Sequence, residues 1–248
     1  MYNTDEHWKA WGEQDPYFGV LSRNEFRKEN IAKYRDEFFD SGAQLMSSVV
    51  AMAVRHFGQF NTESALDFGS GVGRLTIPLA QRFKKVVGVE ISEAMIAEAQ
   101  RNCEGFGVSN VDFVKSDDQL SLVAQKFDFV NCCLVLQHIP PGRGMKIVAR
   151  LLKTLNVGGV IVLQFPVRVD LSGLQQVLYT IKHKAPFTRH WFNLLRGRRI
   201  SEPLMQLNQY DLVEVIALCS ANGVAETTVR SSAFAGGLSA TLVGKKET

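Results

Sequence analysis

The sequence predicts an α/β protein with a doubly wound, mostly parallel sheet of seven strands that ends in a C-terminal antiparallel hairpin. From residue 64 onward, short apolar runs alternate with helical segments, which is typical of parallel strands joined by right-handed crossovers. A glycine-rich turn follows the first strand, and Gly236 and Gly237 separate the last two strands, as in a hairpin. The expected strands are 64–68, 85–90, 110–115, 126–133, 158–165, 224–231 and 237–245.

Two helices are expected before the first strand. Residues 22–40 have helical character, with Ser22 as the N-cap and Glu25 three residues later, as in a capping box. Ser41 and Gly42 interrupt the pattern, and residues 43–57 then carry apolar side chains at helical spacing. We therefore expect 1–60 to form a helical lid or cap and 61–248 to form the main domain.

A basic, aromatic segment interrupts the alternation after the fifth strand. We expect a helical insertion over 167–205, with its helix near 171–183. Residues 171–201 contain six lysines and arginines and no acid, in an otherwise slightly acidic chain. Such a patch indicates an anionic partner. Three alternatives stay open for this segment. It forms a solvated face, or it binds a phosphate, carboxylate or sugar-nucleotide group of the substrate through Arg189 and Arg196. The third alternative is a peripheral membrane contact through 182–199.

The composition is typical of a globular protein. The 248 residues are 46% hydrophobic and 21% charged, with a formal net charge of +3. Apolar runs have strand length and the N-terminus lacks a signal-peptide pattern, so a cytoplasmic protein is expected. The four cysteines have no C-x-x-C spacing, which argues against a metal site or a disulfide framework. The short basic run also argues against a nucleic-acid partner.

The run from residue 65 to residue 76 carries the strongest chemical signal. Asp67 lies near the end of a strand, and glycines follow at 69, 71 and 73. Glycine permits a tight turn and close approach of a ligand, and the helix that follows would present its amides. A dinucleotide fingerprint would need glycine at Arg74 or Thr76, so a nicotinamide oxidoreductase is disfavoured. A tight turn without a ligand is the other interpretation.

The pattern D-x-G-x-G-x-G resembles motif I of the class I S-adenosylmethionine-dependent methyltransferases. The resemblance implies a Rossmann-like fold, S-adenosyl-L-methionine as cofactor and S-adenosyl-L-homocysteine as product. An acid at this position would repel a pyrophosphate, but it suits a ligand with a cationic amino group and a sulfonium. The implied cofactor-binding residues of the turn are Asp67, Gly69, Ser70, Gly71 and Gly73.

Acids also end the second and third expected strands. At Glu90 a carboxylate can accept both hydroxyls of a ribose, and with Ile91 it resembles the second motif of the family. An exposed acid at a strand end is the alternative. After the third strand, the resemblance implies that Asp117 or Asp118 accepts a hydrogen bond from the adenine amino group. Asp117 is the preferred match, and one of the two acids is expected to be only a cap.

The fourth strand leads into the segment Leu134-Val-Leu-Gln-His-Ile-Pro140, which resembles the region after motif IV in small-molecule methyltransferases. The resemblance implies that loop carbonyls near Cys133 and Leu134 contact the methionine portion, and that His138 lies beside the methyl group and the acceptor. An imidazole titrates near neutrality and can remove a hydroxyl proton. A histidine that only orients the loop is the alternative.

We therefore expect a bacterial methyltransferase that acts on a hydroxyl of a small metabolite or glycan precursor, which is anionic or glycosidic, with His138 as base. Tyr17, in the N-terminal lid, closes over the cofactor or donates a hydrogen bond to the substrate, unless it only packs there. Two alternatives stay open. One is an N-methyltransferase of a small amine, and the other is a non-catalytic S-adenosylmethionine-binding sensor or scaffold.

Overall fold

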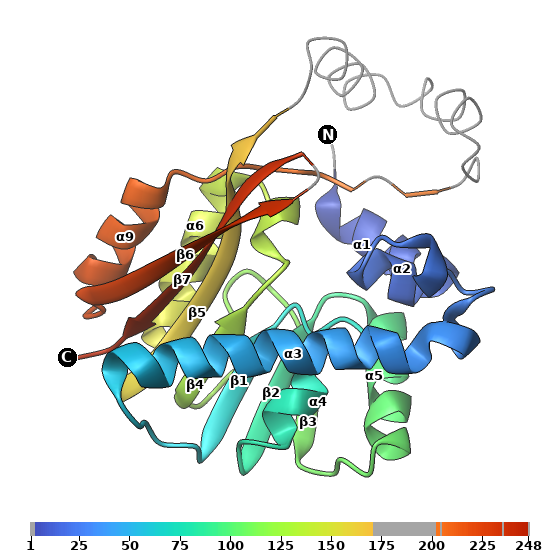
Figure 1. Ribbon diagram of the computed structural model, residues 1–248, viewed down its shortest axis with the longest axis horizontal. Coiled ribbons are helices and arrows are strands. Elements are labelled where there is room, and N and C mark those ends of the chain that lie inside the picture. The colour runs from blue at the N-terminus through green and yellow to red at the C-terminus, as the bar shows by residue number, and fades with distance from the viewer. Residues whose placement is uncertain (1–2, 171–201, 204, 235, 248) are drawn as a thin grey trace.

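The computed structural model describes residues 3–170, 202–203, 205–234 and 236–247. Within them, seven strands form one sheet in the order β3-β2-β1-β4-β5-β7-β6 (Figure 1). The strands from β3 to β5 are parallel, and β7 runs antiparallel to both β5 and β6. The expected Rossmann-like fold with its C-terminal hairpin is therefore confirmed. The chain reverses its direction of progress across the sheet between β1 and β4, where ligands of open α/β sheets bind.

The fifth strand is longer than expected. The strands are β1 (Ser64–Phe68), β2 (Lys85–Glu90), β3 (Val111–Lys115), β4 (Phe127–Cys132), β5 (Leu155–Val169), β6 (Glu226–Phe234) and β7 (Gly237–Lys245). Arg168 and Val169 pair with β7, so the first residues of the expected insertion belong to the sheet, and its start at 167 was wrong. The expected helix at 171–183 lies outside the described residues.

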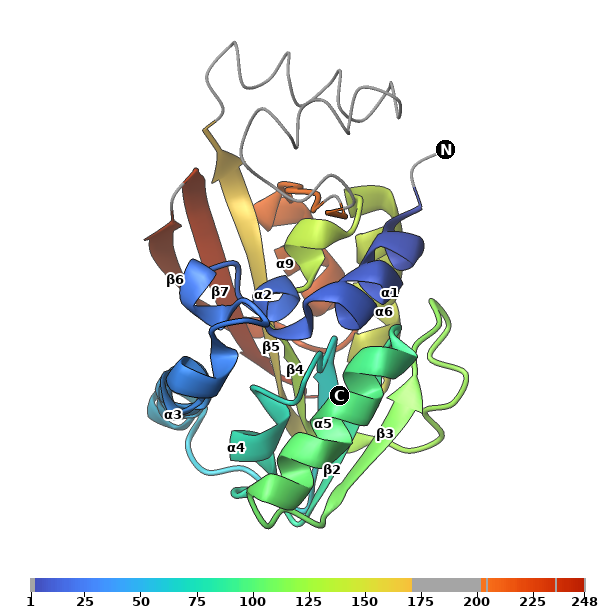
Figure 2. The same ribbon diagram turned by 90° about the vertical axis from the view of Figure 1, so that its right-hand side faces the viewer.

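Helices cover both faces of the sheet (Figures 1 and 2). They are α1 (Thr4–Gln14), α2 (Pro16–Val20), η1 (Asn24–Phe26), α3 (Ile31–Phe57), α4 (Thr76–Ala80), α5 (Glu93–Gly105), η2 (Leu136–His138), α6 (Pro141–Lys153) and α9 (Leu212–Ala221). On β1, Ala65 packs with Met46 of α3, whereas the next residue, Leu66, packs in the cluster of α6 and α9. This alternation places an apolar side chain on each face of the strand.

The N-terminal helices differ from the expectation at two points. The segment 22–40 is not one helix, because α3 begins at Ile31, is kinked at Tyr34 and then continues through Ser41 and Gly42 to Phe57. Ser22 donates to the Phe18 carbonyl (3.3 Å) instead of capping a helix. Gly42 is a buried residue inside the helix. A side chain at this position would collide with the backbone of Arg74, so only glycine fits. The glycine therefore marks a close approach between α3 and the glycine-rich turn, not a helix end.

Within the described residues, no helix is both long enough and apolar enough to cross a bilayer. The same part of the chain contains no group of three or more His, Cys, Asp or Glu side chains arranged to hold a metal ion.

Candidate active site

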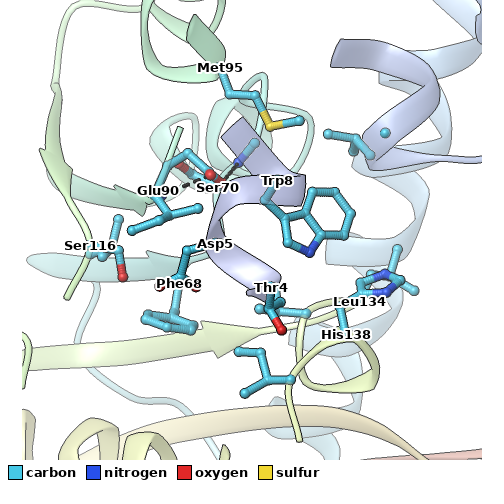
Figure 3. Close-up of a pocket in the computed structure, with 18 of the residues that line it drawn as sticks. Thr4, Asp5, Trp8, Phe68, Ser70, Glu90, Met95, Ser116, Leu134 and His138 are labelled. Carbon is cyan, nitrogen blue, oxygen red and sulfur yellow. Dashed lines mark hydrogen bonds between the residues drawn. The ribbon is translucent and has the colours of Figure 1, made fainter. Parts of the chain in front are cut away.

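A pocket lies at the carboxyl ends of β1, β2, β3 and β4, and α1 and α2 contribute to its lining (Figure 3). It contains about 870 Å³ of space not filled by atoms, with open solvent at its mouth included. The walls come from the glycine-rich turn, the segments after β2, β3 and β4, the start of α6 and the N-terminal helices.

The glycine-rich turn is held by backbone contacts. Gly69, Gly71 and Gly73 all have positive φ, at 75°, 53° and 87°, a region that side chains disfavour. The amides of Gly69 and Ser70 both donate to the Val89 carbonyl, at 2.8 and 3.1 Å, which ties the turn to β2. Gly69, Ser70 and Gly71 line the pocket, whereas Gly73 does not. The Ser70 hydroxyl is buried and has no hydrogen-bond partner among the described residues.

Asp67 holds the turn from behind and does not line the pocket. Its buried carboxylate accepts hydrogen bonds from the Thr76 hydroxyl (2.6 Å) and from the Asn131 amide nitrogen (2.7 Å). Burial raises the pKa of Asp67, and these two hydrogen bonds oppose that rise. The residue expected to contact the cofactor thus joins β1 to α4 and β4, and it can act on a ligand only through the shape of the turn.

Glu90 faces the pocket from the end of β2, and Ile91 lines the pocket beside it. Its Oε2 accepts from the Gly71 amide (3.0 Å), and its Oε1 accepts from the amides of Ile91 (2.8 Å) and Ser92 (2.9 Å). Burial raises the pKa of Glu90, while the three amides oppose that rise. An ionised carboxylate has about four acceptor positions, so Oε2 can still receive a hydroxyl from a ligand.

The two acids after β3 have separate tasks. Asp117 is exposed and away from the pocket, and its Oδ1 accepts from the backbone amides of Gln119 (2.9 Å) and Ser121 (3.0 Å). A hydrogen bond from the Ser121 hydroxyl is the largest of the effects that lower the pKa of Asp117. Asp118 lines the pocket instead. The sequence preferred Asp117 as the acid of the cofactor site, but the acid that lines the pocket is the next residue, Asp118. Asp117 caps its own turn.

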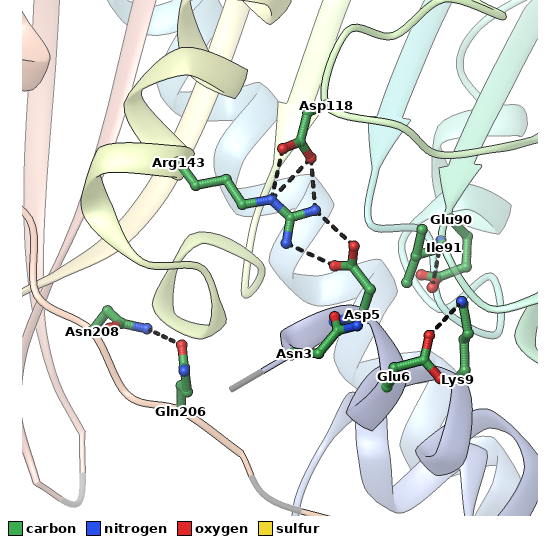
Figure 4. A network of polar contacts seen from close by, with 10 residues as sticks. All are labelled: Asn3, Asp5, Glu6, Lys9, Glu90, Ile91, Asp118, Arg143, Gln206 and Asn208. Carbon is green, nitrogen blue, oxygen red and sulfur yellow. Dashed lines mark hydrogen bonds and ion pairs between the residues drawn. The ribbon is translucent and has the colours of Figure 1, made fainter. Parts of the chain in front are cut away.

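Asp118 shares a guanidinium with the N-terminal helix (Figure 4). Arg143, at the start of α6, donates from Nε and Nη2 to Asp118 at 2.6–2.9 Å. It also donates from Nη1 and Nη2 to the two carboxylate oxygens of Asp5, at 2.7 and 3.0 Å. Bidentate pairs of this kind fix geometry as well as charge. We name the three residues Asp5, Arg143 and Asp118 the latch, because they join α1 to the pocket wall.

His138 lies at the end of the pocket formed by η2 and α1, where its ring packs against Trp8 with centroids 4.7 Å apart (Figure 3). Its Nδ1 lies 2.8 Å from the Gln206 carbonyl, which can only accept, so Nδ1 carries the proton. Nε2 is then the acceptor, 3.0 Å from the side-chain nitrogen of Gln137. Burial lowers the pKa of His138 to about 4, so the imidazole is neutral at physiological pH.

Cys133 and Leu134 line the pocket directly after β4, as the sequence suggested. Leu134 has a φ of 64°, an uncommon conformation for a residue with a side chain. Strained backbone of this kind gathers at functional sites, where the surrounding structure enforces it. Burial raises the pKa of the Cys133 thiol to about 12, so the thiol is neutral.

Of the residues expected to contact substrate, Tyr17 does not line the pocket. The Tyr17 hydroxyl donates to Glu98 (2.6 Å) and also contacts Asn102 Oδ1 (3.0 Å), away from the pocket lining. Its ring packs on Phe38, so the packing interpretation of Tyr17 is the one that fits the geometry. The other two candidates, Arg189 and Arg196, lie outside the described residues.

Several pocket residues were missed by the sequence reasoning. Asp5 and Trp8 come from α1, which was not recognised as a helix, and Arg143 comes from α6. A signal for α1 exists: Asn3 is an N-cap residue whose side chain accepts from the Asp5 amide (3.1 Å), and acids follow in the first turn. The pairing of Asp5 with Arg143 has no such local signal.

The pocket fits S-adenosylmethionine in its polar groups. Glu90 and Asp118 offer carboxylates to hydroxyl and amino donors, which a nucleoside carries. The Ser70 hydroxyl and the Arg74 Nε are buried without a partner among the described residues, so they can serve a polar ligand. The two acids suit the adenosine half of this cofactor, and the cationic Arg74 suits its methionine half, which carries a carboxylate.

Comparisons with known proteins agree with this assignment. Residues 65–159 match the family model described as a methyltransferase domain. Magnesium protoporphyrin IX methyltransferase from Synechocystis PCC 6803, solved with bound S-adenosylmethionine, superposes with a TM-score of 0.59 at 22% identity. That alignment covers 99% of this chain and 98% of the other. The same enzyme with bound S-adenosylhomocysteine gives a TM-score of 0.58.

Sequence relatives match over shorter stretches. The 23S rRNA (uracil(1939)-C(5))-methyltransferase RlmD of Aeromonas salmonicida is 36% identical over 81 residues, which is 33% of this chain and 18% of that protein. The ubiquinone biosynthesis O-methyltransferase of Coxiella burnetii is 29% identical over 144 residues, covering 54% of this chain and 61% of that protein. The chain thus spans less than two thirds of the length of both curated relatives. Residues 65–159 therefore match a methyltransferase domain, and the sheet around them has the Rossmann-like fold of the S-adenosylmethionine-dependent methyltransferase on which the chain superposes.

Proposed function

We propose that this protein methylates a hydroxyl oxygen of a small molecule, a metabolite or a glycan precursor, and that His138 accepts the hydroxyl proton. The observation that carries the proposal is the hydrogen bond from His138 Nδ1 to the Gln206 carbonyl, because it makes Nε2 the acceptor nitrogen of a ring that lines the pocket, where the Gln137 amide now occupies it. When bound, S-adenosylmethionine supplies a methyl group made electrophilic by a positively charged sulfur.

The chain's own residues contribute position and exclusion of water. Trp8 packs against the imidazole, and Phe68 and Leu134 add apolar surface to the lining, which lowers the polarity around the reacting atoms. An acceptor hydroxyl that replaces the Gln137 amide at Nε2 would be oriented by His138. With a pKa of about 4 the imidazole is a weak base, so orientation is its larger contribution and proton removal accompanies methyl transfer.

The N-terminal helices act as a lid in this proposal. Thr4, Asp5 and Trp8 of α1 and Val20 of α2 line the pocket, and the latch ties α1 down. A lid over the acceptor end favours a compact substrate. The basic composition of residues 171–201 would suit an anionic or glycosidic acceptor, or an anionic membrane surface through 182–199.

The test is acceptor screening with the purified protein. We expect methyl transfer from labelled S-adenosylmethionine to hydroxylated small molecules, and a drop in turnover of about 10²-fold in His138→Gln at saturating substrate. Full turnover by His138→Gln would remove the proposed role of the imidazole. Transfer to ribosomal RNA fragments, the substrate in the name of the Aeromonas relative, or to amines would replace the hydroxyl acceptor. Cofactor binding without transfer to any acceptor would favour a sensor.

A further inference from the structure

A buried cation lines the pocket without a matching anion. Arg74, the residue after the last glycine of the turn, is 3% exposed. The hydrogen bond that the described residues provide for its guanidinium runs from Nη1 to the Ser41 hydroxyl (2.9 Å). Its Nε is buried and has no partner within the described part of the chain. A guanidinium has five N–H donors in a planar fork, so most of this fork is left without an acceptor.

The charge of Arg74 is also poorly matched. The acid that acts on it is Asp67, but both carboxylate oxygens of Asp67 already accept hydrogen bonds from Thr76 and Asn131. Burial lowers the pKa of Arg74 to about 10, which still leaves the side chain charged at neutral pH. By contrast, Arg143, which also lines the pocket, is paired with two carboxylates. Burying an unpaired charge is costly, so the Arg74 site is one that an anion would complete.

The sheet order separates the charges of the pocket. Along the carboxyl edge, Asp118 follows β3, Glu90 ends β2, and the glycine-rich turn follows β1. Arg74 lies beyond them, and its charge acts on the thiol of Cys133, which follows β4. The pocket is therefore acidic at the β2–β3 end and cationic at the β1–β4 end. A ligand with hydroxyl and amino donors at one end and a carboxylate at the other is complementary to this order.

We infer that Arg74 binds the carboxylate of the methionine portion of S-adenosylmethionine. The inference rests on the cofactor of the proposed function. The fork of Arg74 supplies N–H donors to the carboxylate oxygens, while the Ser41 hydroxyl, on α3, holds Nη1 in place. Gly42 permits this arrangement, because a side chain there would collide with the backbone of Arg74.

The experiment compares two probes that differ by one carboxylate. Isothermal titration calorimetry measures the affinity of S-adenosylmethionine and of decarboxylated S-adenosylmethionine for the wild type and for Arg74→Met. We expect Arg74→Met to weaken S-adenosylmethionine binding about 10- to 100-fold and to leave the decarboxylated probe within about 2-fold. Arg82→Met is the matched control, because Arg82 also donates to a serine of α3, Ser47 (2.6 Å), but does not line the pocket.

The outcomes are separable. If Arg74→Met retains the wild-type preference for the carboxylated probe, the inference is overturned, and a carboxylate of the acceptor then remains as the ligand of Arg74. If the wild type binds neither probe, the cofactor assignment fails instead. Should Arg74→Met not fold, Arg74→Lys decides: a point charge without the planar fork should reduce the preference about 3- to 10-fold, and an unchanged preference overturns the inference.

Discussion

The two ends of the pocket are built in different ways. The turn end is made by residues close in sequence, Gly69 to Gly71, and their amides bond directly to β2 and to Glu90. The lid end is made by Trp8, Arg143 and His138, which come from three separate helical segments. The comparison teaches that the backbone of the glycine-rich turn is encoded locally, whereas the lid end exists only after distant segments have packed together.

Substitutions in the glycine-rich turn are expected to reduce stability and cofactor affinity more than substitutions elsewhere in the pocket. Gly69→Ala would place a side chain at a φ of 75° and against Val135. We expect a loss of about 2–4 kcal/mol in the free energy of unfolding, together with at least a tenfold loss in cofactor affinity. Gly58→Ala is the control, because Gly58 has a φ of 72° but nothing within 4 Å of the added carbon. Its cost should stay near about 1 kcal/mol in urea denaturation. Equal costs for both variants would contradict the packing argument.

The lid is expected to respond to loss of the latch without global unfolding. Arg143→Met removes the bonds to Asp5 and Asp118, and we expect the unfolding free energy to fall by about 1–2 kcal/mol, since all three side chains are partly exposed. Amide hydrogen exchange in α1 should accelerate about tenfold, while β1 stays protected. Lys9→Met, which removes only an exposed pair with Glu6 on the same helix, should not change exchange in α1. Unchanged exchange in Arg143→Met would show that the latch does not hold the lid.

A pH experiment tests the burial of the lid end. The pKa of His138 in the folded protein is lowered to about 4, below its value of about 6.5 in the unfolded chain. The unfolded state therefore binds the proton first, and the contribution of the neutral ring is complete above pH 6.5 and is lost as the pH falls toward 4. Between pH 7.5 and 5, we expect the wild type to lose about 2 kcal/mol more than His138→Gln in urea denaturation. Identical losses would mean that the ring is solvated.

The smallest expected effect is a difference in cofactor affinity between variants of the two acids after β3. We expect Asp118→Asn to weaken cofactor binding about 3- to 10-fold, because Asp118 lines the pocket and is held by Arg143. Asp117→Asn should change the affinity by less than about 2-fold, since Asp117 only caps its own turn. Calorimetric titration with S-adenosylhomocysteine measures both. The reverse order would restore the register that the sequence favoured.

Local patterns predicted much of the fold. The bounds of β1, β2 and β7 agree with the expected strands, because buried strands have short apolar runs between turn residues. The prediction failed where packing overrode local signals. Gly42 was taken as a helix end, but it is a contact point with Arg74. For Tyr17 the sequence left a lid, a substrate contact or simple packing open, and the contact of its hydroxyl with Glu98 of α5 fits packing.

By itself, the sequence determined the local features that follow one another along the chain. These are an apolar strand, a turn with three glycines, and an acid at the end of the next strand. These follow from backbone sterics and from side-chain periodicity, which neighbouring residues decide. Only the tertiary structure decided that Asp118 faces the pocket, that Arg143 joins it to Asp5 and that Arg74 is buried without an anion. Desolvation and ion pairing depend on which distant segments exclude water from a group, and no local pattern carries that information.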